Sequence, residues 1–222
     1  MDRQKILSML DSTLLKADAK KEDLIKLCED ALKYRFAAVC VHPCHIELCK
    51  ALLEGRMPLA TVVGFPMGAN SSQTKAFEAA DAVRRGADEL DMVINVGAVR
   101  DGDYQKAEED IRGVVKAAEG RAVKVILETC YLTDEQKIQA CLAAARAGAA
   151  FVKTSTGLAG GGATLEDVRL MKKTVGNALK VKAAGGIRSL KECAQFIEAG
   201  AERIGTGAAV KIAEDQAFEG GY

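Results

Sequence analysis

Two lysines lie at the ends of apolar segments, each followed by a glycine-rich stretch. Lys153 ends the run 151–153 and precedes a hydroxyl- and glycine-bearing segment, and Lys182 lies in the run 179–183, before two further glycines. A lysine that leaves a strand of a barrel-like fold points into the catalytic mouth and is partly desolvated. Two such lysines in one site repel each other, which lowers the pKa of one of them until it is a neutral amine near neutral pH. The pair predicts an enzyme that forms an imine with a carbonyl substrate.

Two carboxylates occupy comparable positions in other apolar segments. Asp91 interrupts the run 89–93, and Glu128 ends the run 123–128. An inward-pointing carboxylate in an apolar strand needs a cationic partner, and the two lysines are the expected partners. Asp91 is therefore a candidate for acid–base chemistry beside them. The alternative is that Asp91 and Lys182 form a buried ion pair that only stabilises the fold, because such pairs also perturb pKa values.

Glycine clusters follow the last three apolar segments. Gly157 follows the sixth segment, Gly185 and Gly186 follow the seventh, and Gly205 belongs to a glycine-containing segment placed after the eighth. Backbone amides next to a helix N-terminus bind anions, and the loops after strands seven and eight of a barrel commonly bind phosphate. Arg188 adds a guanidinium that can bind phosphate through two hydrogen bonds. These positions predict a phosphorylated substrate.

A different set of candidate ligands lies near the N-terminal third of the chain. Within ten residues the chain carries Cys40, His42, Cys44, His45 and Cys49. The spacing is poor for zinc, because no second ligand pair lies elsewhere and both histidines of the chain are here. A non-enzymatic metal or redox module is the alternative function that this cluster raises. We expect instead that Cys40 lines the barrel and the others begin a helix, with no metal and no cofactor.

The elements that position these residues alternate regularly. The expected strands are the short apolar or β-branched runs 14–15, 37–41, 59–65, 89–93, 123–128, 151–154, 179–183 and 203–206. The expected amphipathic helices are 22–34, 73–85, 104–118, 134–147, 165–175 and 190–199. Strand–helix alternation demands parallel strands, because each crossover carries a helix. Eight units favour a closed (β/α)8 TIM barrel of the α/β class, and a doubly wound open sheet is the alternative with the same alternation.

Glycines mark where several of these helices should end. A Gly-Ala pair closes a helical segment at Gly86, Gly148 and Gly200, one or two residues before the next strand. Glycine at a helix C-terminus supplies the left-handed turn that returns the chain to the sheet.

Length and composition limit the remaining possibilities. The 222 residues suit one barrel domain over 1–222, with a flexible C-terminal tail at about 214–222. Lysine plus arginine and aspartate plus glutamate both number 31, so no net charge attracts nucleic acid or a membrane surface. The first twenty residues hold no apolar run long enough for a signal sequence, and the seven cysteines fit reduced thiols. We expect a cytoplasmic protein that binds neither nucleic acid nor membrane and forms a homo-oligomer, a dimer.

Several of these segments together resemble a known family. The segments 151–157, 181–188 and 89–91 are similar to the signature segments of the deoxyribose-phosphate aldolase family, which are class I aldolases. The segments 11–15 and 38–41, with the C-terminal Tyr222, are similar to further hallmarks, so the resemblance covers nearly the whole chain.

The resemblance implies a reaction and a role for each site residue. Lys153 is the Schiff-base lysine, Lys182 lowers its pKa, Asp91 and Lys182 form a proton relay, and Tyr222 helps to protonate the enamine carbon. The implied phosphate site comprises Gly157, Gly185, Gly186, Arg188 and Gly205, and the implied substrate pocket includes Cys40 and Thr156. The implied lyase reversibly cleaves 2-deoxy-D-ribose 5-phosphate to acetaldehyde and D-glyceraldehyde 3-phosphate, without metal, in deoxyribose phosphate catabolism.

The chain departs from the family pattern in two places, and one rival enzyme remains. Gly207 and Ala208 stand where the family often supplies hydroxyl groups to phosphate, and Ser12 stands where histidine is frequent. The rival is a phosphosugar isomerase on the same barrel with Glu128 as its base, a reaction that requires no imine.

Overall fold

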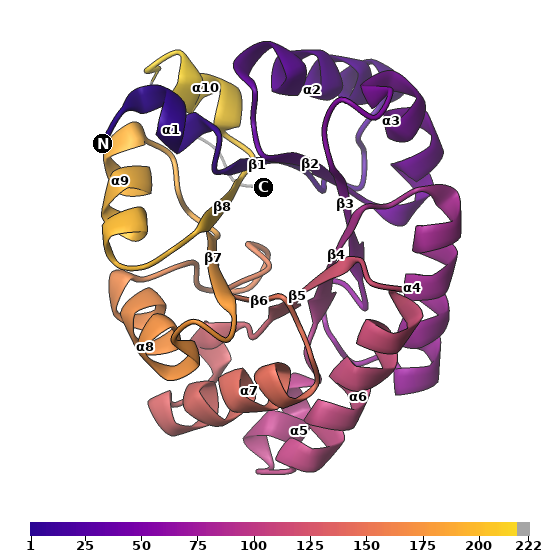
Figure 1. Ribbon diagram of the computed structural model, residues 1–222, viewed down its shortest axis with the longest axis vertical. Helices are drawn as coiled ribbons and strands as arrows, with labels where there is room; N and C mark the ends of the chain where they lie inside the picture. Colours follow the sequence, from indigo (N-terminus) through magenta and orange to yellow (C-terminus); the bar gives the residue numbers. More distant parts are fainter. Residues whose placement is uncertain (217–222) are drawn as a thin grey trace.

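The computed structural model describes residues 1–216 and shows a closed parallel barrel (Figure 1). Each strand pairs with the next along the chain, and the last pairs with the first. The strands are β1 Leu10–Leu14, β2 Ala38–Val41, β3 Leu59–Val63, β4 Glu89–Val93, β5 Ala122–Ile126, β6 Phe151–Lys153, β7 Lys180–Ala184 and β8 Arg203–Thr206. The predicted (β/α)8 barrel is confirmed, and the open sheet is excluded.

Helices surround the ring of strands on its outside (Figure 1). The longer ones are α2 Lys21–Tyr34, α3 Ile46–Leu53, α4 Ser72–Arg85, α6 Tyr104–Ala117, α7 Asp134–Arg146, α8 Leu165–Val175 and α9 Leu190–Glu198. Short helices are α1 Arg3–Leu7, α5 Val96–Arg100, α10 Ala209–Ala213 and the 3-10 turns η1 Pro43–His45 and η2 Thr129–Tyr131. The six predicted helices all form within one residue of the predicted bounds. The sequence did not predict α1, α5 and α10, because five residues are too few to show a helical period.

The glycines expected to end helices have the conformation that this role requires. Gly86, Gly148 and Gly200 have φ angles of 111°, 85° and 113°. Such positive φ values are readily adopted by glycine and rarely by other residues. Each glycine directs the chain from a helix back into the next strand of the barrel.

The first strand differs from the prediction. It was expected at 14–15, but β1 spans Leu10–Leu14 and includes three buried polar residues, Asp11, Ser12 and Thr13. Hydrophobic periodicity cannot detect a strand whose buried side chains are polar. Asp11 can be buried because Lys182 on β7 and Arg203 on β8, both far away in the sequence, donate hydrogen bonds to its carboxylate.

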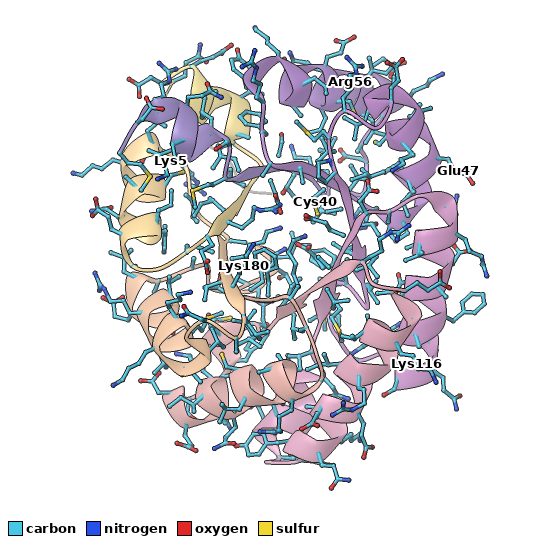
Figure 2. All side chains as sticks on the ribbon, in the orientation of Figure 1. Lys5, Cys40, Glu47, Arg56, Lys116 and Lys180 are labelled. Carbon is cyan, nitrogen blue, oxygen red and sulfur yellow. The ribbon has the colours of Figure 1, made fainter. Side chains whose placement is uncertain are left out.

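Two hydrophobic clusters divide the interior. The large one packs the helices against the outside of the strands, and the small one consists of Leu15, Cys40, Ala60 and Val62 with Phe65 against it. Figure 2 shows Cys40 inside the ring of strands. The small cluster therefore forms an apolar wall on the β2–β3 side of the barrel interior, opposite the charged side chains described below.

The structure also bears on the predicted tail and on the location of the chain. Most of the tail predicted at about 214–222 lies outside the described residues 1–216. Among the described helices, none has the length and apolar character needed to span a membrane. All seven cysteines are free thiols.

Candidate active site

Seven charged side chains meet inside the barrel. We call them the buried charge network: Asp11, Glu89, Asp91, Lys124, Lys153, Lys182 and Arg203. Strand register explains how residues so distant in sequence come together. Lys153 on β6 pairs in register with Lys182 on β7, and Lys182 pairs with Arg203 on β8. Asp91 on β4 pairs with Lys124 on β5. Side chains of residues in register point to the same face of a sheet, which here is the barrel interior.

Asp91 lies at the centre of this network. Its Oδ2 accepts hydrogen bonds from Lys153 at 2.8 Å and from Lys182 at 2.7 Å. Its Oδ1 accepts a bond from Lys124 at 2.6 Å. Burial opposes ionisation of this carboxyl group, but the three lysines outweigh burial and hold its pKa well below the usual value. Asp91 is therefore an ionised carboxylate that contacts the candidate nucleophile directly.

Lys153 has the pKa direction that an imine-forming lysine needs. Burial lowers the pKa of its ammonium group, Lys182 lowers it further, and Asp91 opposes both. The prediction from the sequence named repulsion between the lysines as the cause, whereas in the structure burial is the larger effect and repulsion the smaller one. A lowered pKa increases the fraction of neutral amine, the form that attacks a carbonyl group.

Lys182 behaves in the opposite way. Burial alone would lower its pKa, but Asp11 and Asp91 outweigh burial and raise it above the usual lysine value. Asp11 is itself ionised, because its cationic neighbours outweigh burial and lower its pKa to about 2. The pKa values of these two register-paired lysines are thus shifted in opposite directions, so Lys153 loses its proton before Lys182 does.

Four members of the network were given no role from the sequence. Lys124 lies in the middle of β5, is fully buried and has a raised pKa, since Asp91 leads the carboxylates that outweigh its burial. Its position offered a signal, because a lysine that interrupts an apolar strand is as unusual as Asp91 in β4. Glu89 and Arg203 are the first residues of their strands, where polar residues are ordinary. The partners of Asp11 depend on β1 closing onto β8, which no local pattern shows.

Glu128 was predicted at the end of the fifth strand but lies two residues beyond it, in a left-handed conformation with φ of 55°. Its carboxylate accepts hydrogen bonds from the N–H group and the hydroxyl group of Thr156. Burial raises the pKa of Glu128, partly offset by these bonds. The hydroxyl group of Thr156, a predicted pocket residue, is thus bonded to Glu128.

A cavity lies beside this pair of residues. It has a volume of about 310 Å³ and is lined in part by Glu128, Thr156, Met67, Tyr131 and Leu158. The side chains of Met67, Tyr131 and Leu158 are exposed to solvent. The cavity therefore lies among the loops that follow β3, β4, β5 and β6, and Thr156, three residues after Lys153, is part of its lining.

The structure agrees with the expectation that Cys40 lines the barrel and that the cysteines and histidines after it begin a helix. Cys40 is buried on β2, and burial followed by the charge of Asp91 raises the pKa of its thiol to about 11. Residues 43–45 form η1, and α3 follows directly. Within residues 1–216 no group of three or more histidine, cysteine, aspartate or glutamate side chains is placed to hold a metal ion.

The predicted phosphate-binding glycines lie on two loops that touch each other. Gly157, Gly185 and Gly186 have φ angles of 87°, 94° and 80°, which other residues rarely adopt. The N–H group of Ala163, in the loop after β6, donates to the carbonyl oxygen of Gly185 after β7 at 3.0 Å. Arg188 is exposed just before α9, and its N–H group donates to the Glu192 carboxylate. The two loops and the N-terminus of α9 thus lie together at the C-terminal end of the barrel.

Gly205 lies within β8, inside the run 203–206 expected for the eighth strand, and not in the glycine-containing segment after it. A Cβ atom there would be 2.9 Å from Cε of Lys182 and 3.1 Å from Cβ of Ala184. Glycine is needed because the Lys182 side chain crosses this strand at close range.

We therefore expect Gly205→Ala to lower turnover by about 10²-fold, because Lys182 is a candidate catalytic residue and displacing a catalytic group by about 1 Å costs a factor of this size. Steady-state kinetics, with circular dichroism to verify the fold, measures the effect. Gly160→Ala is the matched control, since nothing lies within 4 Å of a Cβ added there. Equal turnover in both variants would contradict the close packing of Lys182 against β8.

Tyr222, the remaining predicted catalytic residue, lies outside the described residues 1–216.

This fold and site define a (β/α)8 barrel enzyme with a buried lysine of lowered pKa at the C-terminal end of a strand. Residues 5–212 match the model of the family described as DeoC/LacD family aldolase. The chain belongs to this family, and it is an aldolase, a carbon–carbon lyase.

Relatives and a solved structure agree with this assignment. Deoxyribose-phosphate aldolase from Clostridium perfringens is 50% identical over 224 residues, which cover 100% of both chains. The protein of the same name from Thermococcus kodakarensis is 54% identical over 96% of this chain and 98% of its own. The tetrameric deoxyribose-phosphate aldolase from Aeropyrum pernix superposes with a TM-score of 0.91 at 33% identity, covering 96% of this chain and 92% of that one.

Proposed function

We propose that this aldolase reversibly cleaves 2-deoxy-D-ribose 5-phosphate to acetaldehyde and D-glyceraldehyde 3-phosphate through a Schiff base on Lys153. The single observation that carries the proposal is the environment of Lys153. Its amine is buried, has a lowered pKa and is bonded to the ionised Asp91, which also binds the charged Lys182. The names of the relatives support the choice of substrate.

The chemistry follows from these groups. The neutral amine of Lys153 adds to the aldehyde carbon C1 of the open-chain sugar and gives a carbinolamine, which loses water to form an iminium ion. When the hydroxyl group on C3 loses its proton, the C2–C3 bond breaks and its electron pair flows to the iminium nitrogen. Glyceraldehyde 3-phosphate leaves, and an enamine remains on Lys153. Protonation at C2 and addition of water then release acetaldehyde, so the iminium serves as the electron sink that a metal supplies in other aldolases.

Asp91 and Lys182 are positioned to move the protons of these steps. Lys182 contacts Asp91, and Asp91 contacts the Lys153 amine. A proton released at one step can therefore return at a later step without passing through bulk water. We propose that they protonate the carbinolamine hydroxyl group before water leaves and later supply a proton to the enamine carbon C2. Cys40 and the apolar wall around it are proposed to lie against the two-carbon unit, because an aldehyde methyl group offers nothing polar to bind.

The phosphate group is proposed to bind at the loops that meet at the C-terminal end of the barrel. The N–H groups of Gly157, Gly185 and Gly186 and the side chain of Arg188 form this site, with the backbone of Gly205 on β8 beside it. Amide groups near the N-terminus of α9 favour a dianion there.

Product analysis tests the reaction. Incubation with 2-deoxy-D-ribose 5-phosphate should release acetaldehyde and glyceraldehyde 3-phosphate in equal amounts. A phosphosugar isomerase with Glu128 as base would instead return a product of unchanged mass and no acetaldehyde. The Thr156 N–H group donates to both oxygens of the Glu128 carboxylate, so these oxygens are already engaged and less available to act as a base. This arrangement favours the lyase over the isomerase.

Tyr222 is proposed to help protonate the enamine carbon, a role that the family resemblance implies. Changing Tyr222 to Phe should leave imine formation intact and slow the exchange of deuterium into the methyl group of acetaldehyde. Exchange at the unaltered rate would leave Asp91 and Lys182 as the sufficient proton carriers.

We further propose that the enzyme acts in deoxyribose phosphate catabolism in the cytoplasm, where its seven free thiols fit a reducing compartment. For assembly we propose a homodimer, which light scattering tests against the tetramer described for the Aeropyrum pernix enzyme.

A further inference from the structure

The buried charge network contains one cation more than it contains carboxylates. Its three carboxylates are Asp11, Glu89 and Asp91, and its four basic groups are Lys124, Lys153, Lys182 and Arg203. If Lys153 is neutral, three positive charges face three negative charges. A buried cluster avoids an unpaired charge, because the interior screens such a charge poorly. The balance of charge thus favours one neutral amine in the network.

Arg203 and Glu89 belong to this network but lie away from the reacting atoms. The Arg203 guanidinium contacts the Asp11 carboxylate at 2.7 Å and the Glu89 carboxylate at 3.2 Å. Both residues begin their strands, whereas Lys153 ends β6. They therefore lie at the N-terminal end of the barrel interior, on the side opposite to the catalytic mouth.

Two chains of ion pairs connect this end to Lys153. Along one chain, Arg203 binds Asp11, Asp11 accepts a bond from Lys182, and Lys182 binds the Oδ2 atom of Asp91. Along the other, Glu89 contacts Lys124 at 2.7 Å, and Lys124 binds the Oδ1 atom of Asp91 at 2.6 Å. The Arg203–Glu89 contact closes the two chains into a ring that ends at the carboxylate bonded to Lys153.

We propose that Arg203 and Glu89 are positioning residues whose opposite charges set how readily the Lys153 ammonium group loses its proton to give the neutral amine. The proposal rests on the proposed imine chemistry and adds to it that the protonation state of the nucleophile is controlled from the N-terminal end of the barrel. Arginine suits this place, because its guanidinium stays charged when buried and can bridge two carboxylates.

Other ionisable groups near Lys153 and Arg203 lie outside the ring of ion pairs and are unaltered in the variants described below. Cys40 faces Lys153 from β2 as a neutral thiol, and the Glu128 carboxylate after β5, which accepts a bond from Thr156, interacts electrostatically with Lys153. On the side of Arg203, the ring of Phe151 lies 5.6 Å from the guanidinium carbon, and the exposed Lys180 contacts the same ring. Lys180 is in water, where its charge is strongly screened.

The two charges predict shifts of opposite sign. Arg203→Met removes a positive charge, leaves the network with a net negative charge and stabilises the Lys153 ammonium, so the pKa of Lys153 rises. Glu89→Gln removes a negative charge, destabilises the ammonium and lowers that pKa. The expected size is on the order of one pH unit in each direction, as Coulomb's law gives for unit charges about 10 Å apart at an effective dielectric constant of about 20.

The experiment measures the rate at which acetaldehyde and cyanoborohydride form an ethyl adduct on the full-length protein, as a function of pH. The acid midpoint of this profile should move up in R203M and down in E89Q. It should stay near the unaltered value in R203K, which keeps the charge, and in the R203M/E89Q double variant, which keeps the balance. A role in folding alone does not produce opposite shifts that cancel in combination.

Each outcome decides the question. Midpoints that coincide in all four variants, or that move in the same direction in R203M and E89Q, overturn this proposal while the adduct itself upholds the imine chemistry. Absence of an adduct in the unaltered protein overturns the imine chemistry and this proposal with it. If circular dichroism shows that R203M is unfolded, E89Q decides alone, and a midpoint that does not fall overturns the proposal.

Discussion

Lys182→Leu should lower turnover by about 10³-fold or more and should move the remaining activity to higher pH. The variant removes the charged lysine of the proposed proton relay, and positioned acid–base groups contribute on the order of 10² to 10⁴. It also removes the positive charge that helps to lower the pKa of Lys153, so this pKa rises. The neutral amine then appears only at higher pH, and the acid limb of the rate profile follows it.

The pH profile of kcat/KM measures both effects in the Lys182→Leu variant. Lys180→Leu is the matched control, because Lys180 lies on the same strand but is exposed. We expect the control to retain nearly full turnover with an unchanged profile. A folded Lys182→Leu enzyme with an unshifted acid limb would show that the charge of Lys182 does not act on Lys153.

Asp91→Asn should reduce turnover by about 10² to 10⁴ and should move the acid limb in the opposite direction. Asparagine cannot carry the proton that the Asp91 carboxylate accepts and returns in the proposed relay. The loss of a negative charge beside the Lys153 ammonium lowers the pKa of that group, since Asp91 is the strongest of the groups that raise it in the native protein. The amine is then neutral at lower pH, yet the later steps are slow. Parallel kinetics and imine trapping separate the two effects.

The same substitution tests the stability of the buried charges. Removing one partner of a buried ion pair typically costs about 3–5 kcal/mol, and here three lysines lose their shared acceptor. Asp91→Asn should therefore have a clearly lower Tm. Asp81→Asn breaks a surface ion pair with Arg84 and should change Tm little and turnover not at all. An Asp91→Asn protein with native turnover would remove Asp91 from the mechanism.

The repeating parts of this fold could be predicted from the sequence. Amphipathic periods identified α2, α4 and α6 to α9, and the glycines at 86, 148 and 200 marked where chain direction changes. The strands other than β1 were found from their apolar residues. The bounds of strand β1 were predicted wrongly because its buried residues are polar. The burial of Asp11 depends on ion pairs with Lys182 and Arg203, more than 170 residues away along the chain.

The site could be predicted only in part for a related reason. Lys153, Lys182 and Asp91 interrupt apolar segments, so their types alone made them candidates, and the strand register brings them into contact. Glu89 and Arg203 look like ordinary polar strand starts, and only barrel closure makes them neighbours. That burial exceeds repulsion in lowering the pKa of Lys153 depends on how completely the surrounding side chains exclude water, which spacing in the sequence does not reveal.

Imine formation on Lys153 is tested most directly by mass spectrometry after treatment with acetaldehyde and borohydride. Reduction converts the imine to a stable secondary amine, so each chain should gain one ethyl group. Peptide mapping should place this group on Lys153, the one lysine of the network with a lowered pKa. An ethyl group on Lys182 would reverse the roles of the two lysines, and a chain of unchanged mass would contradict Schiff-base chemistry in this enzyme.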